Sequence, residues 1–353
     1  MTSGEASATP PPAGARPPTP PARPEGWLDA RERGGVFAIR LTVLITTFLG
    51  RGLGRLIARV VTLYYVLTSP RVRGAIRGYY AHLRGGAEAS FGQVYAHLLR
   101  FVFCTLDAFF FVRGKTKLFE ITCTGQHYLS ALRDGKKGAI LLGGHVGSFY
   151  AMRGQSENER LPLYAVVYTK NARMLNEALE QLDPAGAAKL VQLDPEGGLD
   201  SMLRVRELVE QGAIVAIMGD RVPAGASGGR VVRVPFLGAE ASFPAGPFLL
   251  ASMLKCPVYL TFGLSHGSKR YDLYCEPFAD KIDLPRKDRD GALREVVRRY
   301  AERLEHYTKL APDNWFNFYD FWAAPPPPPP PTIASSAQSA PARPEASMSE
   351  SDS

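Results

Sequence analysis

The sequence is poor in cysteine and has none of the residue spacings that usually hold a metal ion. Its four cysteines are Cys104, Cys123, Cys256 and Cys275, with no CxxC motif and no paired Cys/His pattern. Each lies in an apolar stretch, where a free thiol packs as a small hydrophobic group. We therefore expect four buried, reduced cysteines, and neither a metal nor a cofactor.

The sequence also shows no cleavable signal peptide, and its first apolar run is short for a membrane span. The first apolar run, Val36–Gly50, contains Arg40 and is shorter than the ~20 residues that a membrane span needs. The hydrophobic share of 45% is typical of a globular chain and too low for a multi-pass membrane protein. A protein that faces the cytosol is expected.

Proline divides the chain into a central part and two tails. Residues 1–25 contain eight prolines, and residues 323–353 contain nine, including the run Pro325–Pro331. Such segments cannot bury enough apolar surface to fold, so both tails are predicted to be disordered. Between them we expect a basic helical region at 26–115 and an α/β domain at 116–322.

Positive charge is concentrated near the N-terminus. Residues 27–84 contain ten arginines, no lysine and two acids, so they account for a charge excess equal to the +8 of the whole chain. Arg51, Arg55 and Arg59 recur every four residues and should line one face of a helix, with aliphatic residues mainly opposite. An apolar face beside an arginine face predicts an interfacial helix on a membrane with anionic lipids.

Two other interpretations of this region are open. A core-packed helix with a solvated edge has the same residue pattern. Nucleic acid fits less well, because the aromatic residues here alternate with aliphatic residues rather than with polar groups that read bases. We therefore expect no nucleic-acid partner.

From residue 118 onward, short β-branched runs alternate with helical stretches. This alternation predicts a mostly parallel twisted sheet flanked by helices, with functional sites at the carboxyl ends of its strands. The predicted strands are Leu118–Cys123, Ala139–Leu142, Leu163–Tyr168, Ala213–Met218, Pro257–Phe262 and Tyr271–Cys275. The predicted helices are Gln126–Arg133, Ala172–Leu182, Leu199–Glu210, Ala245–Leu254 and Asp288–Thr308.

The segment GAILLGGHVGSFYAMR, residues 138–153, has the strongest signature of chemistry. A buried strand leads into two glycines, then His145, Gly147 and Ser148, and then a helical stretch. A histidine between glycines at a strand end is poorly placed for core packing, so its neutral ring can accept a proton from a hydroxyl. Ser148 is the expected helix N-cap. The other five histidines are interpreted as structural.

On this segment the sequence resembles the late acyltransferases of lipid A biosynthesis, within the lysophospholipid acyltransferase superfamily. In that family an Asp or Glu five residues after the histidine orients the imidazole. Here that position is Tyr150, and a neutral phenol stabilises an imidazolium far less than a carboxylate does. The resemblance leaves three possibilities: a slow enzyme, an acid supplied from elsewhere, or a protein that binds without catalysing.

The resemblance extends over residues 27–322 through further blocks in the family's order. Arg31–Gly34, preceded by Trp27, is similar to bacterial branches of the group. The later blocks are Gly219–Arg221, the basic segment with Arg230 and Arg233 ending in Phe236–Gly238, Phe243–Pro247, Lys255–Val258, Tyr271–Phe278 and Asn314–Trp322. Several blocks in the correct order carry more weight than any one of them.

The resemblance implies a glycerolipid acyltransferase-like fold and acyl transfer to a hydroxyl of a lipid or glycolipid. The donor would be an acyl carrier protein thioester or acyl-CoA, and the location the cytoplasmic face of a bacterial inner membrane. His145 would be the base, with Tyr150 in the position of its acid. The candidate substrate-binding residues are Gly147, Ser148, Arg153, Asp220, Arg221, Arg230, Phe243, Pro244 and Gly246.

Each of these roles has an ordinary alternative. Arg221, with Arg230 or Arg233, can hold a phosphate of the donor or acceptor, or can form surface ion pairs with Asp220 and Glu240. Phe243 and Pro244 can line an acyl channel or fill a core. The aromatic run 314–322 can cover the core or form an interfacial belt.

Two other functions are compatible with parts of the pattern. A catalytically degenerate homologue that binds lipid or carrier as an accessory protein would explain Tyr150. A serine hydrolase that uses Ser148 fits poorly, because the glycine that a nucleophile elbow needs two residues after the serine is missing.

Overall fold

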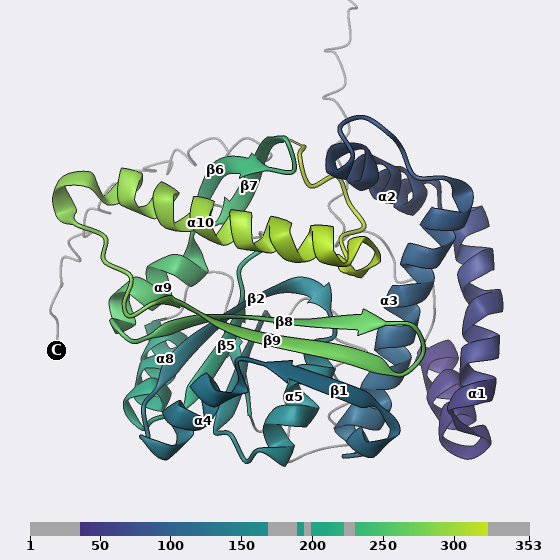
Figure 1. The fold of residues 1–353 in the computed structure, drawn as a ribbon, viewed down its shortest axis with the longest axis horizontal. Coiled ribbons are helices and arrows are strands. Elements are labelled where there is room, and N and C mark those ends of the chain that lie inside the picture. Colours follow the sequence, from purple (N-terminus) through teal and green to yellow (C-terminus); the bar gives the residue numbers. More distant parts are fainter. Residues whose placement is uncertain (1–35, 169–188, 194–198, 222–229, 324–353) are drawn as a thin grey trace, which may run out of the picture.

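The computed structural model describes residues 36–168, 189–193, 199–221 and 230–323 of the chain. Its body is a seven-stranded sheet with helices on both faces (Figure 1), in the strand order β1-β9-β8-β2-β5-β3-β4. The predicted helix Ala172–Leu182, and nearly all of the two proline-rich tails, lie outside the described residues.

The seven strands are short, and most run in one direction. They are β1 (Glu120–Thr124), β2 (Ala139–Gly147), β3 (Leu163–Tyr168), β4 (Leu190–Leu193), β5 (Ile214–Met218), β8 (Val258–His266) and β9 (Arg270–Ala279). Neighbouring strands from β8 to β4 are parallel, whereas β9 is antiparallel to β8, and β1 is parallel to β9. The predicted mostly parallel α/β fold is confirmed.

Helices cover both faces of this sheet. They are α4 (Gln126–Asp134), α5 (Phe149–Asn158), α8 (Leu199–Glu210), α9 (Gly246–Leu254) and α10 (Arg289–Leu310). Along β2, Ile140 and Leu142 pack into the main core with residues of α8, α9 and α10, whereas Ala139 and Leu141 pack against Leu132 of α4. Burial on both faces explains why β2 is apolar without alternation, as expected of a central parallel strand.

A two-stranded hairpin that the sequence interpretation missed lies beside α10. Its strands are β6 (Val231–Phe236) and β7 (Ala239–Pro244), joined by Leu237 and Gly238. Both linking residues have positive φ, 49° and 82°, as in the tight turns that favour hairpins. Phe243 and Pro244 therefore belong to a strand, and the helix predicted from Ala245 begins at Gly246.

Three N-terminal helices pack at one end of the sheet: α1 (Val36–Thr68), α2 (Pro70–Leu83) and α3 (Phe91–Val112). In Figure 1, α3 lies between α1 and the sheet. Gly50, with φ of 80°, divides α1 into two helical parts. The helical character predicted for residues 26–115 is thus present over the described part, 36–115.

The expectation that the arginines of α1 face outward is wrong for Arg51 and Arg55. Asp107 of α3, only 1% exposed, accepts hydrogen bonds from Arg51 Nε and Nη2, both at 2.7 Å, and from the Tyr271 hydroxyl at 2.8 Å. Arg55 is 7% exposed, 3.6 Å from the same carboxylate, with its guanidinium over the Phe103 ring. A buried carboxylate needs such partners, so it draws the arginine face inward.

Because the arginines turn inward, an apolar face of α1 turns outward. The exposed residues of this face, here called the α1 apolar face, are Leu53, Leu56, Val60, Val61, Leu63, Tyr64 and Leu67. Val60 is 67% exposed and Tyr64 63%. A contiguous exposed apolar surface on one helix is typical of an interaction site.

Of the described helices, α3 is the one whose length and composition would allow it to cross a membrane. Its most apolar window has a mean hydropathy of 1.5, but 61% of that window is buried inside the protein. Since α3 carries Asp107 and packs between α1 and the sheet, its apolar composition is explained by core packing.

The four cysteines are free, as expected. Cys104, Cys256 and Cys275 are buried and Cys123 is partly buried. Burial raises the pKa of the Cys104 thiol to about 12 and that of Cys256 to about 11, so both are protonated and unreactive at neutral pH.

Candidate active site

His145 lies near the carboxyl end of β2, where the ladder becomes irregular. The register between β2 and β8 is regular up to the pair Gly143 and Thr261 and resumes, shifted, at Gly147 and Gly263. His145 occupies the irregular stretch between these pairs. The strand thus continues past Leu142, its predicted end, and His145 is held on both sides by sheet.

The carboxylate of Asp220 binds His145 twice. Asp220 follows β5, the parallel neighbour of β2, so both residues lie at the same edge of the sheet. Its Oδ1 lies 2.7 Å from His145 Nδ1, and its Oδ2 accepts the His145 backbone N–H at 2.8 Å. A carboxylate that holds both the ring and the main chain determines the orientation of the imidazole.

Two glycines make this close approach possible. A Cβ on Gly144 would lie 2.8 Å from Leu304 Cδ1 and 3.4 Å from Asp220 Oδ2. Gly147 has φ of +72°, and a Cβ there would meet the Gly263 carbonyl oxygen at 1.9 Å. The glycine spacing around His145 therefore reflects tight packing of the backbone.

The pKa values of Asp220 and His145 both lie below their ordinary values. Burial alone would raise the pKa of Asp220, but the charge and hydrogen bonds of His145, together with the charge of Arg221, outweigh it and lower that pKa to about 2. Burial, and then the charge of Arg221, lower the pKa of His145, while Asp220 opposes them. Near neutral pH the pair is thus a carboxylate and a neutral imidazole.

This charge state decides which nitrogen of the ring carries the proton. An ionised carboxylate only accepts hydrogen bonds, so Nδ1 of His145 is the donor to Asp220. The lone pair of the neutral ring then lies on Nε2, on the opposite side from Asp220. With 31% of its side-chain surface exposed, His145 can be reached by another molecule, whereas Asp220, at 1%, cannot.

Arg221 places a second charge beside the pair. Its Nη2 donates to the main-chain carbonyl of Phe316, and its Nε is buried without a hydrogen-bond partner among the described residues. Burial lowers its pKa, although Asp220 opposes this, and a guanidinium remains charged at neutral pH. The structure thus brings together Asp220 and Arg221, two of the predicted binding residues, with His145.

Ser148 has a structural task here. It is 3% exposed, and its hydroxyl oxygen accepts the Ala151 N–H at 3.2 Å as the N-cap of α5. This is the predicted cap, and burial of the hydroxyl argues against a serine nucleophile.

Tyr150 occupies the first turn of α5. It packs at the edge of an apolar cluster that includes Cys104, Phe111 and Phe316, with its ring edge-on to Phe149. His145 Nδ1 contacts Asp220, so the imidazole has a carboxylate beside it although position 150 is a tyrosine.

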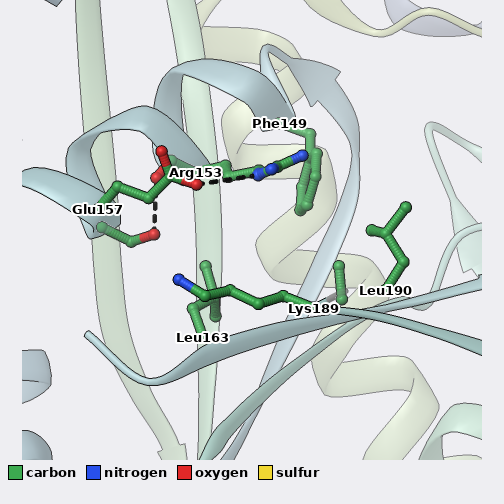
Figure 2. A pocket seen from close by; sticks show the side chains of 8 residues that line it. Phe149, Arg153, Glu157, Leu163, Lys189 and Leu190 are labelled. Atoms are coloured by element: carbon green, nitrogen blue, oxygen red, sulfur yellow. Dashed lines mark hydrogen bonds and ion pairs between the residues drawn. The ribbon is translucent and has the colours of Figure 1, made fainter. Parts of the chain in front are cut away.

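Arg153, also on α5, lies at a small hollow (Figure 2). The hollow is also lined by Phe149, Lys189 and Leu190. Arg153 Nε lies 3.3 Å from Glu157 Oε1 and is largely buried, so this arginine is part of a local ion pair.

The remaining predicted binding residues lie in or near the β6–β7 hairpin. Arg230 precedes β6 and pairs with Asp290 of α10 at 2.5 Å, at the rim of a hollow of about 320 Å³. Phe243 is fully buried, edge-on to Phe236, and Pro244 is also buried. These two fill the core, whereas Gly246 is exposed at the start of α9.

The C-terminal aromatic run partly covers the core and reaches the site. Trp315 and Phe321 are buried, and Phe316 N donates to the His145 carbonyl at 2.8 Å. Tyr300 of α10, which sequence interpretation did not single out, donates its hydroxyl hydrogen to the Gly143 carbonyl at 2.7 Å. These residues carry no catalytic signature in sequence, because aromatic residues at helical spacing look like ordinary core.

The arrangement has the features that a general base requires. A buried carboxylate orients a neutral imidazole whose free nitrogen is accessible, with a cation nearby that can stabilise developing negative charge. Within the described residues, no group of three His, Cys, Asp or Glu side chains is placed to hold a metal ion.

Residues 93–323 match the family model described as bacterial lipid A biosynthesis acyltransferase. No curated protein sequence matches the chain significantly. The matched segment includes nearly all of α3, the whole sheet and every residue discussed at the site.

Proposed function

The chain belongs to the bacterial lipid A biosynthesis acyltransferase family, and we propose from this premise that His145 and Asp220 catalyse its acyl transfer. The reaction moves a fatty acyl group from a thioester donor to a hydroxyl group of a lipid or glycolipid. In this proposal Asp220 orients the imidazole of His145. An acid five residues after the histidine would otherwise do this, but Tyr150 occupies that position and carries no carboxylate.

The observation that carries the proposal is the double hydrogen bond between Asp220 and His145. It supplies the orientation, the tautomer and the charge that a histidine base needs. An accessory protein that only binds lipid would have no use for an ionised carboxylate buried against an accessible imidazole. The pair therefore favours an active enzyme over a degenerate homologue.

The reaction balances with these residues alone. Nε2 of His145 takes the proton of the acceptor hydroxyl while the hydroxyl oxygen bonds to the thioester carbonyl carbon. The tetrahedral intermediate then collapses, the carbon–sulfur bond breaks, and the imidazolium returns its proton to the leaving thiolate. Asp220 stays ionised throughout and stabilises the transient imidazolium.

Arg221 is proposed to bind the negative charge of the reacting molecules. It follows Asp220 directly, and its charge already acts on the His145 ring. A guanidinium in this place can stabilise the oxyanion of the intermediate or hold a phosphate of the donor or acceptor. We propose an acyl carrier protein thioester as the donor, with acyl-CoA as the second choice.

The α1 apolar face is proposed to rest on the bilayer that contains the acceptor. Its exposed Leu56, Val60 and Leu67 would enter the acyl-chain layer, as the apolar face of an interfacial helix does. The inner membrane, at its cytoplasmic face, is the proposed location. In this arrangement Arg51 and Arg55 hold α1 to the protein rather than contacting headgroups.

The test is a transfer assay with the full-length protein in detergent or liposomes. Acyl carrier thioester and acyl-CoA are each offered with a bacterial lipid extract, and acylated products are identified by mass spectrometry. Transfer that disappears in His145→Ala is the expected result. A wild-type protein that binds lipid and carrier but transfers nothing from either donor would establish the accessory role instead.

A further inference from the structure

Trp315 makes a third hydrogen bond to the carboxylate that orients His145. It follows the short helix η3 (Pro312–Asn314) and is 1% exposed. Its indole Nε1 donates to Asp220 Oδ2 at 3.3 Å, the same oxygen that accepts the His145 backbone N–H. The other oxygen, Oδ1, is left for the imidazole.

The main chain of Trp315 is held against β2. It forms an isolated antiparallel bridge with Val146, and the next residue, Phe316, donates its N–H to the carbonyl of His145. The main chain of Trp315 is thus bound to the same strand that carries the imidazole. The positions of the indole, the carboxylate and the imidazole relative to one another are therefore held fixed.

A buried histidine secures the other side of Trp315. His97 Nε2 of α3 lies 3.0 Å from the Trp315 carbonyl, and His97 is fully buried. Burial lowers the pKa of His97 to about 4, so its ring is neutral at physiological pH. Because a carbonyl only accepts, Nε2 carries the proton and donates it to Trp315.

The packing of the indole leaves it little freedom to move. The rings of Tyr79 and Phe236 lie 5.1 and 5.3 Å from it, from α2 and β6 respectively. Elements from both ends of the chain therefore hold one N–H group on Asp220. An ordinary core tryptophan needs only some acceptor for its N–H; this one uses an ionised carboxylate bonded to the candidate base.

We propose that Trp315 is a positioning residue, whose indole N–H holds Asp220 in the orientation and ionisation state that His145 needs as a base. The inference rests on the proposed function of His145. Without the indole donor, Asp220 accepts one hydrogen bond fewer, so its negative charge is less stabilised. It then attracts the proton of the imidazole ring more strongly. The imidazolium form is then favoured, and the pKa of His145 rises.

The titration of His145 is a direct readout of this role. Among the residues that the structure describes, the other titratable groups facing the pair are Arg221 after β5, Tyr300 of α10 and Tyr319 of the C-terminal segment. All three remain in a Trp315 variant, so a change in the titration reports the loss of the indole donor.

The experiment compares wild type, Trp315→Phe and Trp322→Phe as full-length proteins. Trp322 is a matched control, because it belongs to the same aromatic run but donates its indole N–H to the Phe236 carbonyl. NMR titration of histidine labelled at Cε1, with His145→Gln to assign the signal, measures the pKa of His145. Acyl transfer gives kcat and KM.

In Trp315→Phe we expect the pKa of His145 to rise by about half a unit or more. We also expect kcat to fall about 10-fold to 100-fold, as for loss of a hydrogen bond to a charged group, with little change in KM. Trp322→Phe should leave both values unchanged. An unchanged pKa in folded Trp315→Phe, or an equal shift in the control, overturns the proposal.

A second substitution covers the case in which Trp315→Phe does not fold. Placing β-(3-benzothienyl)alanine at position 315 exchanges the indole N–H for sulfur at nearly the same volume. The same rise in pKa is expected, and its absence is decisive against a positioning role. The titration needs no substrate. If the wild-type protein proves inactive, the proposed function fails, but the titration still tests the role of Trp315.

Discussion

Asp220 holds His145 by the ring and by the main chain at once, through Nδ1 at 2.7 Å and the backbone N–H at 2.8 Å. A contact through the ring alone would let the backbone of His145 move relative to the carboxylate. The double contact instead couples the direction of the ring to the path of β2. The carboxylate follows the neighbouring strand β5. Asp220 therefore lies beside His145 in space although the two residues are far apart in the sequence.

Removing either member of this pair should abolish most of the acyl transfer. We expect kcat/KM to fall by about 10²–10⁴ in His145→Gln, because the base is lost, and to fall strongly in Asp220→Asn, because the ring loses its charged partner. Asp283→Asn, at an exposed surface ion pair, is the matched control. Full activity in Asp220→Asn would assign the orienting role to another residue.

The pH dependence of kcat/KM should show an acidic limb below pH 6.5. His145 works as a base only when neutral, and burial lowers its pKa, so activity is retained below the ordinary histidine pKa and lost as pH falls through the shifted value. Asp220→Asn removes the group that raises this pKa, which moves the limb to lower pH. A limb above 6.5 in wild type would contradict this charge balance.

Tyr150→Glu should not improve catalysis. The Nδ1 of His145 already has a carboxylate partner, and position 150 borders an apolar cluster where a new charge is costly. We expect a lower melting temperature and no gain in kcat, whereas Tyr150→Phe should stay within a few-fold of wild type. A rate increase above about 10-fold in Tyr150→Glu would indicate that Asp220 is an inadequate partner.

Charges on the α1 apolar face should release the protein from membranes. Val60→Asp with Leu67→Asp places two charges where the proposed bilayer contact lies, so flotation with anionic liposomes should fall strongly. Leu203→Asp with Met253→Asp changes two exposed apolar residues on α8 and α9 and should float as wild type does. Equal flotation of all three proteins would exclude α1 as the anchor.

Asp107 should contribute much more to stability than a surface acid does. Asp107→Ala leaves the partly buried Arg51 and the buried Arg55 without their shared carboxylate, which costs about 3–5 kcal/mol in comparable buried pairs. Asp134→Ala, at the exposed pair with Arg133, should cost far less, because solvent screens such a pair. Denaturant unfolding measures both, and equal losses would refute the structural role of the buried cluster.

Much of the fold was predictable because its signals are local. Apolar runs such as Leu163–Tyr168 and the helix Leu199–Glu210 have the predicted bounds in the structure. The β6–β7 hairpin was missed, since Leu237 is an unusual residue for a turn with positive φ. The short strand Leu190–Leu193 was missed as well, because four residues carry little periodicity.

The site was predictable only in part, because its members meet through tertiary structure. His145 stood out by its glycines, and Asp220 and Arg221 by their place after a strand. Pairing Asp220 with His145 required knowledge that β5 lies beside β2. The inward turn of Arg51 similarly depends on Asp107, one acid within an otherwise apolar helix, which helical periodicity in α1 alone does not reveal.

The bridge between Val146 and Trp315 has a consequence for biosynthesis. A ribosome makes the strand with the histidine long before it makes the residues that lie against it. Chains fold progressively as they emerge, so β2 can form while the residues that lie against it are still inside the ribosome. The indole contact to Asp220 therefore completes the surroundings of His145 only after Trp315 and the segment that follows it have left the exit tunnel.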